Sequence, residues 1–261
     1  MNVGFVPNTK RIMSLSKPYK RTVRQFTKEA KKQGGLWHYI QHEDFAESPE
    51  HYVRAFLIIL KDFKNLLDYV EPSDINLPTY SFRIHELLLR ICIEIEANFV
   101  AILKENGYSK AGDWKMSDYK KVNVSHRLSY YEVKLPVWNG VQNIRRPFEA
   151  WENDSRLPWW NAYNKTKHNR HTEFERATFE NLTNSICALI TLLSAQFEDN
   201  DFAATDMGLS MGGGHQDGME STIGGYFRVK YPDNWPEEEK YGFLWSTVKN
   251  GENPITTYSY E

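Results

Sequence analysis

Four long segments of the sequence repeat apolar residues at the three- and four-residue spacing of an amphipathic α-helix. In chain order they are residues 48–72, residues 81–106, a segment that begins at Pro158, and residues 178–197. Each helix has to bury its apolar stripe against another element, so these segments favour a helical bundle. The sequence therefore predicts a mainly α fold. The second segment is expected at the centre, because its apolar arc is the widest.

Local signals mark the ends of these helices. Ser48 is expected to cap the first helix, since a serine side chain accepts backbone hydrogen bonds there and the proline that follows suits the first turn. Gly107 is a stop signal after the second helix. Within that helix, Arg90 lies four residues from both Glu86 and Glu94, which predicts pairing along one face.

The rest of the chain divides around a core of residues 48–199. Residues 1–47 form a basic arm, in which a short helix is expected over residues 22–32. Residues 108–157 separate the second and third helices and are interpreted as an insertion. Within this insertion, residues 130–135 have the composition of a β-strand.

The composition changes again after the last helix. Residues 200–261 are expected to form a flexible loop around Gly212–Gly214 and a small β appendage. In this appendage residues 226–231 alternate and are rich in β-forming side chains. Residues 241–248 are expected to pair with them.

The charge of the chain is unevenly distributed. The first 36 residues contain nine Lys and Arg against one acid, whereas residues 198–261 contain twelve acids against four Lys and Arg. A basic arm can neutralise phosphates, form a solvated surface, or dock on the acidic tail of its own chain. The sequence leaves these alternatives open.

Cysteine usage and hydropathy indicate the compartment. Cys92 and Cys187 each lie in an apolar helical run, so they are expected to be buried thiols and not a disulfide or a metal site. The N-terminus lacks an apolar run of signal-peptide length, and charges interrupt the apolar segments. We therefore expect a cytoplasmic protein with no membrane partner and no cofactor.

The segment from Ser155 to Thr172 contains no acidic residue. On a helix, Asn164 and His168 lie four residues apart and share a face. Cations neutralise phosphate oxygens, and histidine transfers protons near neutral pH. The segment is thus a candidate phosphate-handling surface. Its basic residues and histidines are Arg156, Lys165, Lys167, His168, Arg170 and His171.

The run Tyr163-Asn164-Lys165-Thr166-Lys167-His168, followed by a long apolar helix, resembles the signature region of HEPN (higher eukaryotes and prokaryotes nucleotide-binding) domains. The run of residues 86–96 resembles the second helix of such bundles. The resemblance covers about residues 50–106 and 157–197. It implies a HEPN-like helical bundle with an insertion between helices.

Many HEPN proteins are metal-independent ribonucleases of toxin–antitoxin or antiphage systems. Their motif contains an arginine, usually a neighbouring polar residue, and a histidine a few positions later. Here the polar residue is Asn164 and the histidine is His168, but Tyr163 stands at the arginine position and cannot supply a permanent cation.

The resemblance implies cleavage of RNA by attack of the 2′-hydroxyl on the neighbouring phosphate. His168 would act as general acid or base, Asn164 would orient it, and Lys165 would offset negative charge. HEPN sites are commonly completed by dimerisation, so a homodimer is expected, with RNA and an antitoxin or other protein as partners. The implied phosphate-binding residues are Tyr163, Lys167, Arg170, His171 and Arg156.

Two other function classes fit the same residues. The bundle could be a non-catalytic interaction or dimerisation module, in which the helix dipole alone favours a histidine near a helix end. His168, His171 and Glu175 have a spacing that is compatible with a metal site, which would indicate a metal-dependent hydrolase.

Overall fold

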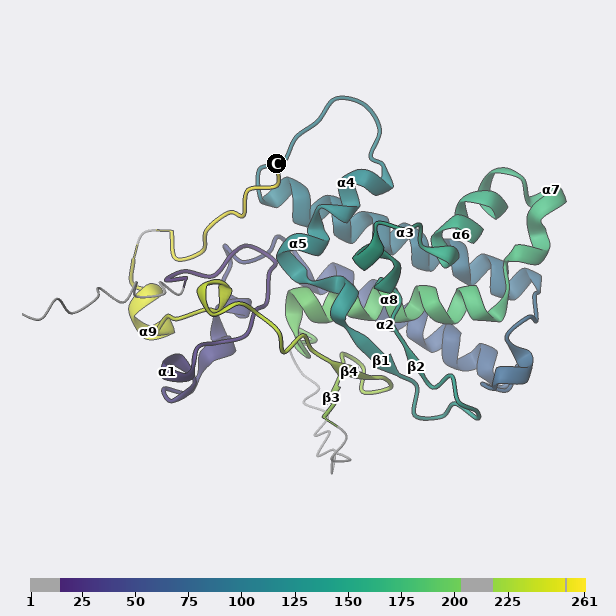
Figure 1. Ribbon diagram of the computed structural model, residues 1–261, viewed down its shortest axis with the longest axis horizontal. Coiled ribbons are helices and arrows are strands. Elements are labelled where there is room, and N and C mark those ends of the chain that lie inside the picture. Colours follow the sequence, from purple (N-terminus) through teal and green to yellow (C-terminus); the bar gives the residue numbers. More distant parts are fainter. Residues whose placement is uncertain (1–14, 203–217, 252) are drawn as a thin grey trace, which may run out of the picture.

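The computed structural model describes residues 15–202, 218–251 and 253–261. Within these ranges the protein is mainly α-helical with one small antiparallel sheet, as the sequence predicts (Figure 1). The expected loop around Gly212–Gly214 lies outside the described residues. No helix in the described ranges is long and apolar enough to span a membrane.

Four long helices form the bundle at the right of Figure 1. They are α2 (Pro49–Leu67), α3 (Phe82–Glu105), α6 (Pro158–His168) and α8 (Phe179–Phe197). As predicted, α3 is central, because it contacts α2, α6 and α8. The most buried helix is nevertheless α8, which is covered by α3 and α6 and by the sheet. Burial on every side explains why its sequence is apolar or small almost throughout.

One of the two predicted helix-end signals is confirmed: Gly107, with a φ of 83°, follows the C-cap residue of α3. The Ser81 hydroxyl accepts a hydrogen bond from the Ile84 backbone at 3.2 Å and caps α3. Thr178 caps α8 in the same way. The prediction that Ser48 caps α2 is wrong: its backbone is left-handed (φ 47°), and its side chain makes no capping bond. Side-chain capping requires the extended backbone that Ser81 has.

One small sheet joins the insertion to the C-terminal part of the chain. Its strands are β1 (Glu132–Lys134), β2 (Ile144–Arg145), β3 (Glu220–Ser221) and β4 (Arg228–Lys230), in the order β2-β1-β4-β3. All pairs are antiparallel, and Val133 of β1 lies opposite Val229 of β4. Both valines are buried, and β1 packs on α8, so the sheet closes one side of the bundle.

The predicted pairing of residues 241–248 with 226–231 is wrong. Within the described residues, β4 pairs with β1 and β3, and residues 245–248 form a short helix. Tyr241 instead makes isolated bridges to Leu15 and Phe26. Its hydroxyl donates to the Thr22 carbonyl at 2.9 Å, which draws this segment onto the N-terminal arm.

Short helices connect these parts. They are α1 (Lys28–Lys31), α4 (Met116–Lys120), α5 (Val122–His126), α7 (Arg170–Glu173) and α9 (Trp245–Val248), with 3₁₀ turns η1 (Leu36–Gln41), η2 (Asp74–Asn76), η3 (Leu128–Tyr130), η4 (Glu149–Asn153), η5 (Phe174–Arg176) and η6 (Glu237–Glu239). The helix expected over residues 22–32 is thus reduced to its last turn, because residues 22–26 run along neighbouring chain segments.

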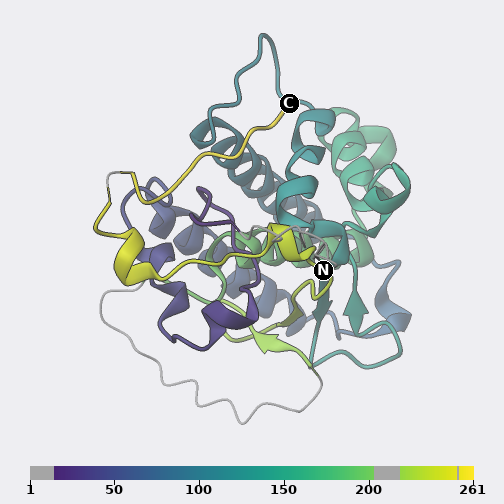
Figure 2. The same cartoon turned by 60° about the vertical axis from the view of Figure 1, so that its left-hand side comes forward.

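The described part of the basic arm is folded onto the protein. Arg21 is fully buried and donates to Glu105 (2.7 Å), Gln196 (2.9 Å) and the Glu47 carbonyl (2.8 Å). Arg24 is also buried and donates to the carbonyl of Glu239 in the acidic C-terminal segment. Figure 2 shows the N-terminal and C-terminal segments side by side. Docking on its own acidic tail is therefore the alternative that holds for Arg24.

Candidate nucleic-acid interface

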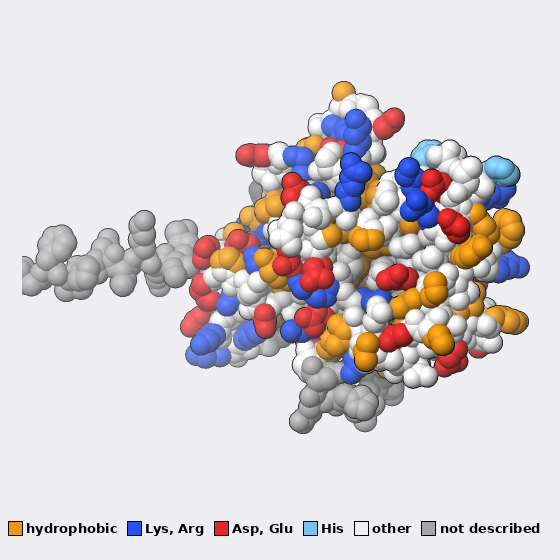
Figure 3. All heavy atoms as spheres, turned by 45° about the vertical axis from the view of Figure 1, so that its right-hand side comes forward, with side chains coloured by type: hydrophobic (Ala, Val, Ile, Leu, Met, Phe, Trp, Pro, Cys, Tyr) orange, Lys and Arg blue, Asp and Glu red, His pale blue; other side chains and the backbone are white. Residues whose placement is uncertain are grey.

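The acid-free segment covers one end of the bundle. Helix α6 buries Trp159, Trp160 and Thr166 and ends at His168, where Asn169 leaves helical geometry (φ −129°). Helix α7 and turn η5 then lead into α8. This end lies at the right of Figure 1, and in Figure 3 histidine, Lys or Arg, and hydrophobic side chains lie near one another there.

The predicted catalytic residues share an accessible side of α6. His168 and Lys165 are exposed, and Asn164 is half-buried. They lie opposite the face that α6 packs on α3 and α8. The helical spacing of Asn164 and His168 is confirmed, since both lie within α6. A ligand on this side of the helix would meet an amide, an imidazole and an ammonium group.

Tyr163, the residue at the family's arginine position, lies in the core. Its side chain is fully buried, and its hydroxyl donates to Glu96 Oε1 at 3.3 Å and accepts from Lys167 Nζ at 2.9 Å. Burial and the negative charge of Glu96 raise the pKa of Tyr163. The prediction that Tyr163 contacts phosphate is therefore wrong: it packs in the core and positions Lys167. Sequence spacing could not reveal this, because Glu96 lies 67 residues away.

The cations of the interface are accessible and have no acidic partner. Arg156, Lys165, Lys167 and Arg170 are exposed, and none of them forms an ion pair with a carboxylate among the described residues. His171 in α7 is also exposed. Glu173 and Glu175 follow this segment, but Glu173 pairs with Arg176, so the unpaired cations outnumber the unpaired carboxylates and create a positive potential that attracts phosphate.

Lys167 differs from the other cations in its surroundings. It lines a groove of about 820 Å³ beside α3, together with the carboxylates of Glu47, Glu96, Glu105 and Asp113. An anionic ligand would be repelled from this groove. The positive potential is therefore expected to be strongest on the side of α6 and α7 that faces away from the groove.

A group of aromatic side chains adjoins the cations. Tyr80 and Phe82, at the start of α3, are 51% and 67% exposed, and Phe174 of η5 lies against both. Arg170 lies over the Phe82 ring, with its Cζ atom 5.8 Å from the ring centroid. The sequence does not predict that these aromatic side chains lie together. The available signal was Phe82, a large apolar residue outside the periodic apolar face of its helix.

His85 lies beneath these aromatic rings. It is 6% exposed, and its ring centroid is 5.7 Å from that of Phe174. Its buried Nε2 atom has no hydrogen-bond partner among the described residues. Burial, together with the nearby charge of Arg170, lowers the pKa of His85, although the Thr166 backbone opposes this. His85 is therefore neutral at physiological pH.

The residues of the metal alternative do not converge. Across residues 15–202, 218–251 and 253–261, no group of three or more His, Cys, Asp and Glu side chains is arranged to hold a metal ion. His168, His171 and Glu175 are exposed and do not form the site that their spacing suggested. Cys92 and Cys187 are free and buried, as predicted, and burial raises the pKa of both thiols.

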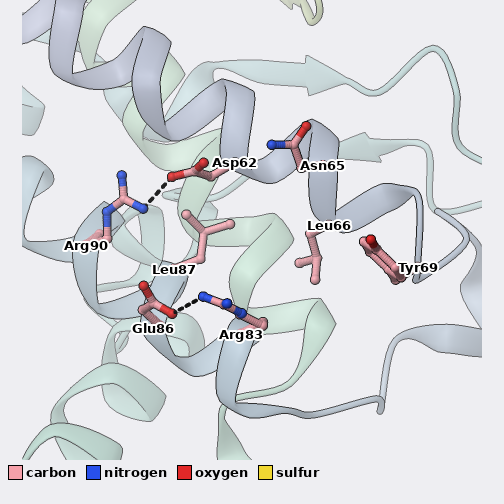
Figure 4. A pocket seen from close by; sticks show the side chains of 8 residues that line it. All are labelled: Asp62, Asn65, Leu66, Tyr69, Arg83, Glu86, Leu87 and Arg90. Atoms are coloured by element: carbon pink, nitrogen blue, oxygen red, sulfur yellow. Dashed lines mark hydrogen bonds and ion pairs between the residues drawn. The ribbon is translucent and has the colours of Figure 1, made fainter.

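A separate pocket of about 340 Å³ lies between α2 and α3 (Figure 4). Its arginines are both neutralised: Arg90 pairs with Asp62 at 2.5 Å and Arg83 with Glu86 at 3.0 Å. Arg90 therefore pairs across the two helices. The prediction that it pairs with Glu86 and Glu94 along α3 is wrong. The pocket presents no unpaired cation to an anionic ligand.

The accessible, acid-free end of α6 and the aromatic group beside it are thus the features that fit a polyanionic ligand with ring systems. We refer to Asn164, Lys165, His168, Arg170 and His171 as the α6–α7 interface. The chain was compared with models of protein families, with curated proteins and with solved structures, and none of these comparisons gave a match.

Proposed function

We propose that the protein is a HEPN-like, RNA-directed protein that cleaves RNA without a metal ion at the α6–α7 interface. The observation that carries the proposal is the set of exposed, unpaired cations in a segment without acidic residues, next to two exposed histidines. Cations supply affinity for the phosphate backbone, and imidazoles supply proton transfer at neutral pH. The helical bundle and the position of His168 at the end of α6 are compatible with the HEPN resemblance.

In the proposed reaction, His168 removes the proton of a ribose 2′-hydroxyl. The 2′-oxygen then attacks the adjacent phosphorus, and the bond from phosphorus to the 5′-oxygen breaks. Lys165 and Arg170 offset the charge that develops on the phosphoryl oxygens. The leaving 5′-oxygen takes a proton from a second imidazolium, either His171 or His168 of a second copy. The products are a cyclic phosphate and a 5′-hydroxyl.

A second candidate function is a non-catalytic RNA-binding or partner-binding module. The burial of Tyr163 favours it, because the position at which the family carries an arginine supplies no cation to the surface. In this case the α6–α7 interface binds RNA or a partner protein, such as an antitoxin, without cleaving it. Homodimerisation is compatible with either function.

The decisive experiment is cleavage of a mixed RNA pool by purified protein in a chelating buffer. The parent protein should cleave RNA, and His168→Ala should not. His51→Ala is the matched control, since His51 is an exposed histidine on α2 outside the interface. Binding of the uncleaved RNA should weaken with salt, with a slope of log K against log salt near −3 if four phosphates are contacted at about −0.7 each.

The outcomes separate the candidates. Loss of cleavage in His168→Ala alone supports catalysis at this interface. RNA binding with a steep salt dependence but no cleavage by folded parent protein supports the non-catalytic module. Cleavage that survives His168→Ala, or that disappears in chelator, contradicts the proposed mechanism.

A further inference from the structure

The aromatic group beside Arg170 forms an exposed surface that the bundle does not require. Phe82, the first residue of the central helix α3, is 67% exposed, and Tyr80, which precedes the N-cap residue Ser81, is 51% exposed. Phe174 of η5 packs against both. Its ring centroid lies 4.6 Å from that of Phe82 and 5.6 Å from that of Tyr80. We call these three residues the aromatic platform. Clustered exposed aromatic surface commonly marks a binding site.

The platform is held by backbone contacts between distant parts of the chain. Tyr80 forms a bridge with Thr178, and the Phe179 backbone donates to the Thr79 carbonyl at 2.7 Å. The buried ring of His85 supports Phe174 from below. The backbone segments that carry these rings are therefore held together before a ligand arrives, which reduces the entropy lost on binding.

Charge decides between the partners that an aromatic surface can bind. Arg170 lies over Phe82 and has no carboxylate partner among the described residues. The nearby carboxylates Glu86 and Glu173 are each paired, with Arg83 and Arg176 respectively. The exposed carboxylate of Glu175 lies beside Phe174 on η5 and forms no ion pair among the described residues, so the net charge around the platform is close to balanced. The unpaired guanidinium over the Phe82 ring nevertheless favours a ligand that combines a ring system with a phosphate over an apolar protein surface.

We propose that the aromatic platform binds an unpaired base of single-stranded RNA, stacked on Phe82, while Arg170 contacts the adjacent phosphate. This inference rests on the proposed function and adds the substrate class to it. A duplex keeps its base faces stacked on one another, so only a single strand offers a face to the Phe82 ring. The interface accordingly distinguishes single-stranded from double-stranded RNA, without reading a particular sequence.

The test is fluorescence anisotropy with a single-stranded oligouridine and with a duplex RNA of equal length. All proteins carry His168→Ala, so that no strand is cleaved. Phe82→Leu should weaken binding of the single strand by about 5- to 150-fold, since stacking on an aromatic ring contributes about 1–3 kcal/mol per base. Binding of the duplex should be unchanged. Phe82→Trp should retain binding of the single strand, because it keeps a stacking surface.

Tyr130→Leu provides a matched control. Tyr130 is 40% exposed and also has an arginine over its ring, Arg127, at 4.7 Å, but it lies on η3 outside the platform. It should leave the affinity for both RNAs unchanged. Arg170→Ala should weaken binding of both RNAs and make the salt dependence shallower, because it removes a phosphate contact.

Three results overturn the inference. The first is unchanged affinity of Phe82→Leu for the single strand while the parent binds RNA, which leaves the proposed function intact. The second is an equal loss with the duplex, which shows that Phe82 acts without base stacking. The third is absence of RNA binding by the parent protein, which removes the proposed function as well. A change of oligomeric state in Phe82→Leu without an effect on RNA would assign the platform to protein contact.

Discussion

Glu198 makes the stability of this protein sensitive to alkaline pH. It caps the C-terminal end of α8 with a left-handed backbone (φ 57°), and its carboxyl group has no hydrogen bond or ion pair with any described residue. Burial, together with the neighbouring charges of Asp199 and Glu220, raises the pKa of Glu198 from 4.5 to about 8. The folded protein therefore binds this proton more tightly than the unfolded chain does.

The sign and size of the effect follow from linkage. The contribution of Glu198 to stability is fully present below pH 4.5 and is lost as the pH rises through 8, because ionisation of Glu198 is easier in the unfolded chain. At about 1.4 kcal/mol per pH unit, the complete loss is about 5 kcal/mol. About 2 kcal/mol of this loss in the free energy of unfolding occurs between roughly pH 6.5 and pH 9. Relaxation and water entry around the carboxylate reduce these values.

The assay is urea unfolding of the parent protein and of Glu198→Gln across this range. The free energy of unfolding of the parent should fall by about 1–2 kcal/mol, and Glu198→Gln should remove most of that fall. Glu238→Gln, in an exposed turn, should behave as the parent does. Equal pH slopes for the parent and Glu198→Gln would refute the reasoning.

A different residue, His126, makes the stability of the protein decrease at acidic pH. His126 is fully buried, and burial lowers its pKa from 6.5 to about 4, assisted by the charges of Arg24 and Arg21. Its contribution to stability is present above pH 6.5 and is lost as the pH falls towards 4. The two groups therefore act in different pH ranges, and the range above pH 6.5 separates Glu198 from His126. The buried thiols Cys92 and Cys187 add to the loss only as the pH approaches 9, and they do so equally in the parent and in Glu198→Gln.

Two substitutions test buried polar contacts of the bundle. Arg21→Ala should lower the free energy of unfolding by about 3–5 kcal/mol, since it leaves Glu105 without its partner, whereas Arg156→Ala should change it by less than about 0.5 kcal/mol. Tyr163→Phe should cost about 1–2 kcal/mol in urea unfolding, because Glu96 and Lys167 lose the shared hydroxyl. An effect of Tyr163→Phe on RNA binding that persists when Lys167 is replaced by alanine would show that this tyrosine acts on the ligand directly and not through Lys167.

The candidate site was only partly predictable from the sequence. The accessible side of α6 could be predicted, because helical spacing alone brings Asn164, Lys165 and His168 close together. The burial of Tyr163 was not, because it depends on Glu96 of another helix. The aromatic platform was missed for the same reason, since Phe82 and Phe174 come from segments that only the fold brings together.

The sequence by itself determined the helices of the bundle, since the periodicity of apolar residues and the stop signal of Gly107 act over a few residues. Tertiary structure decided which strands pair and where the arginines of the basic arm lie. β1 joins β4 across nearly one hundred residues, and Arg21 reaches Gln196 over 175 residues. Such contacts depend on shape and charge complementarity between segments that no local pattern relates.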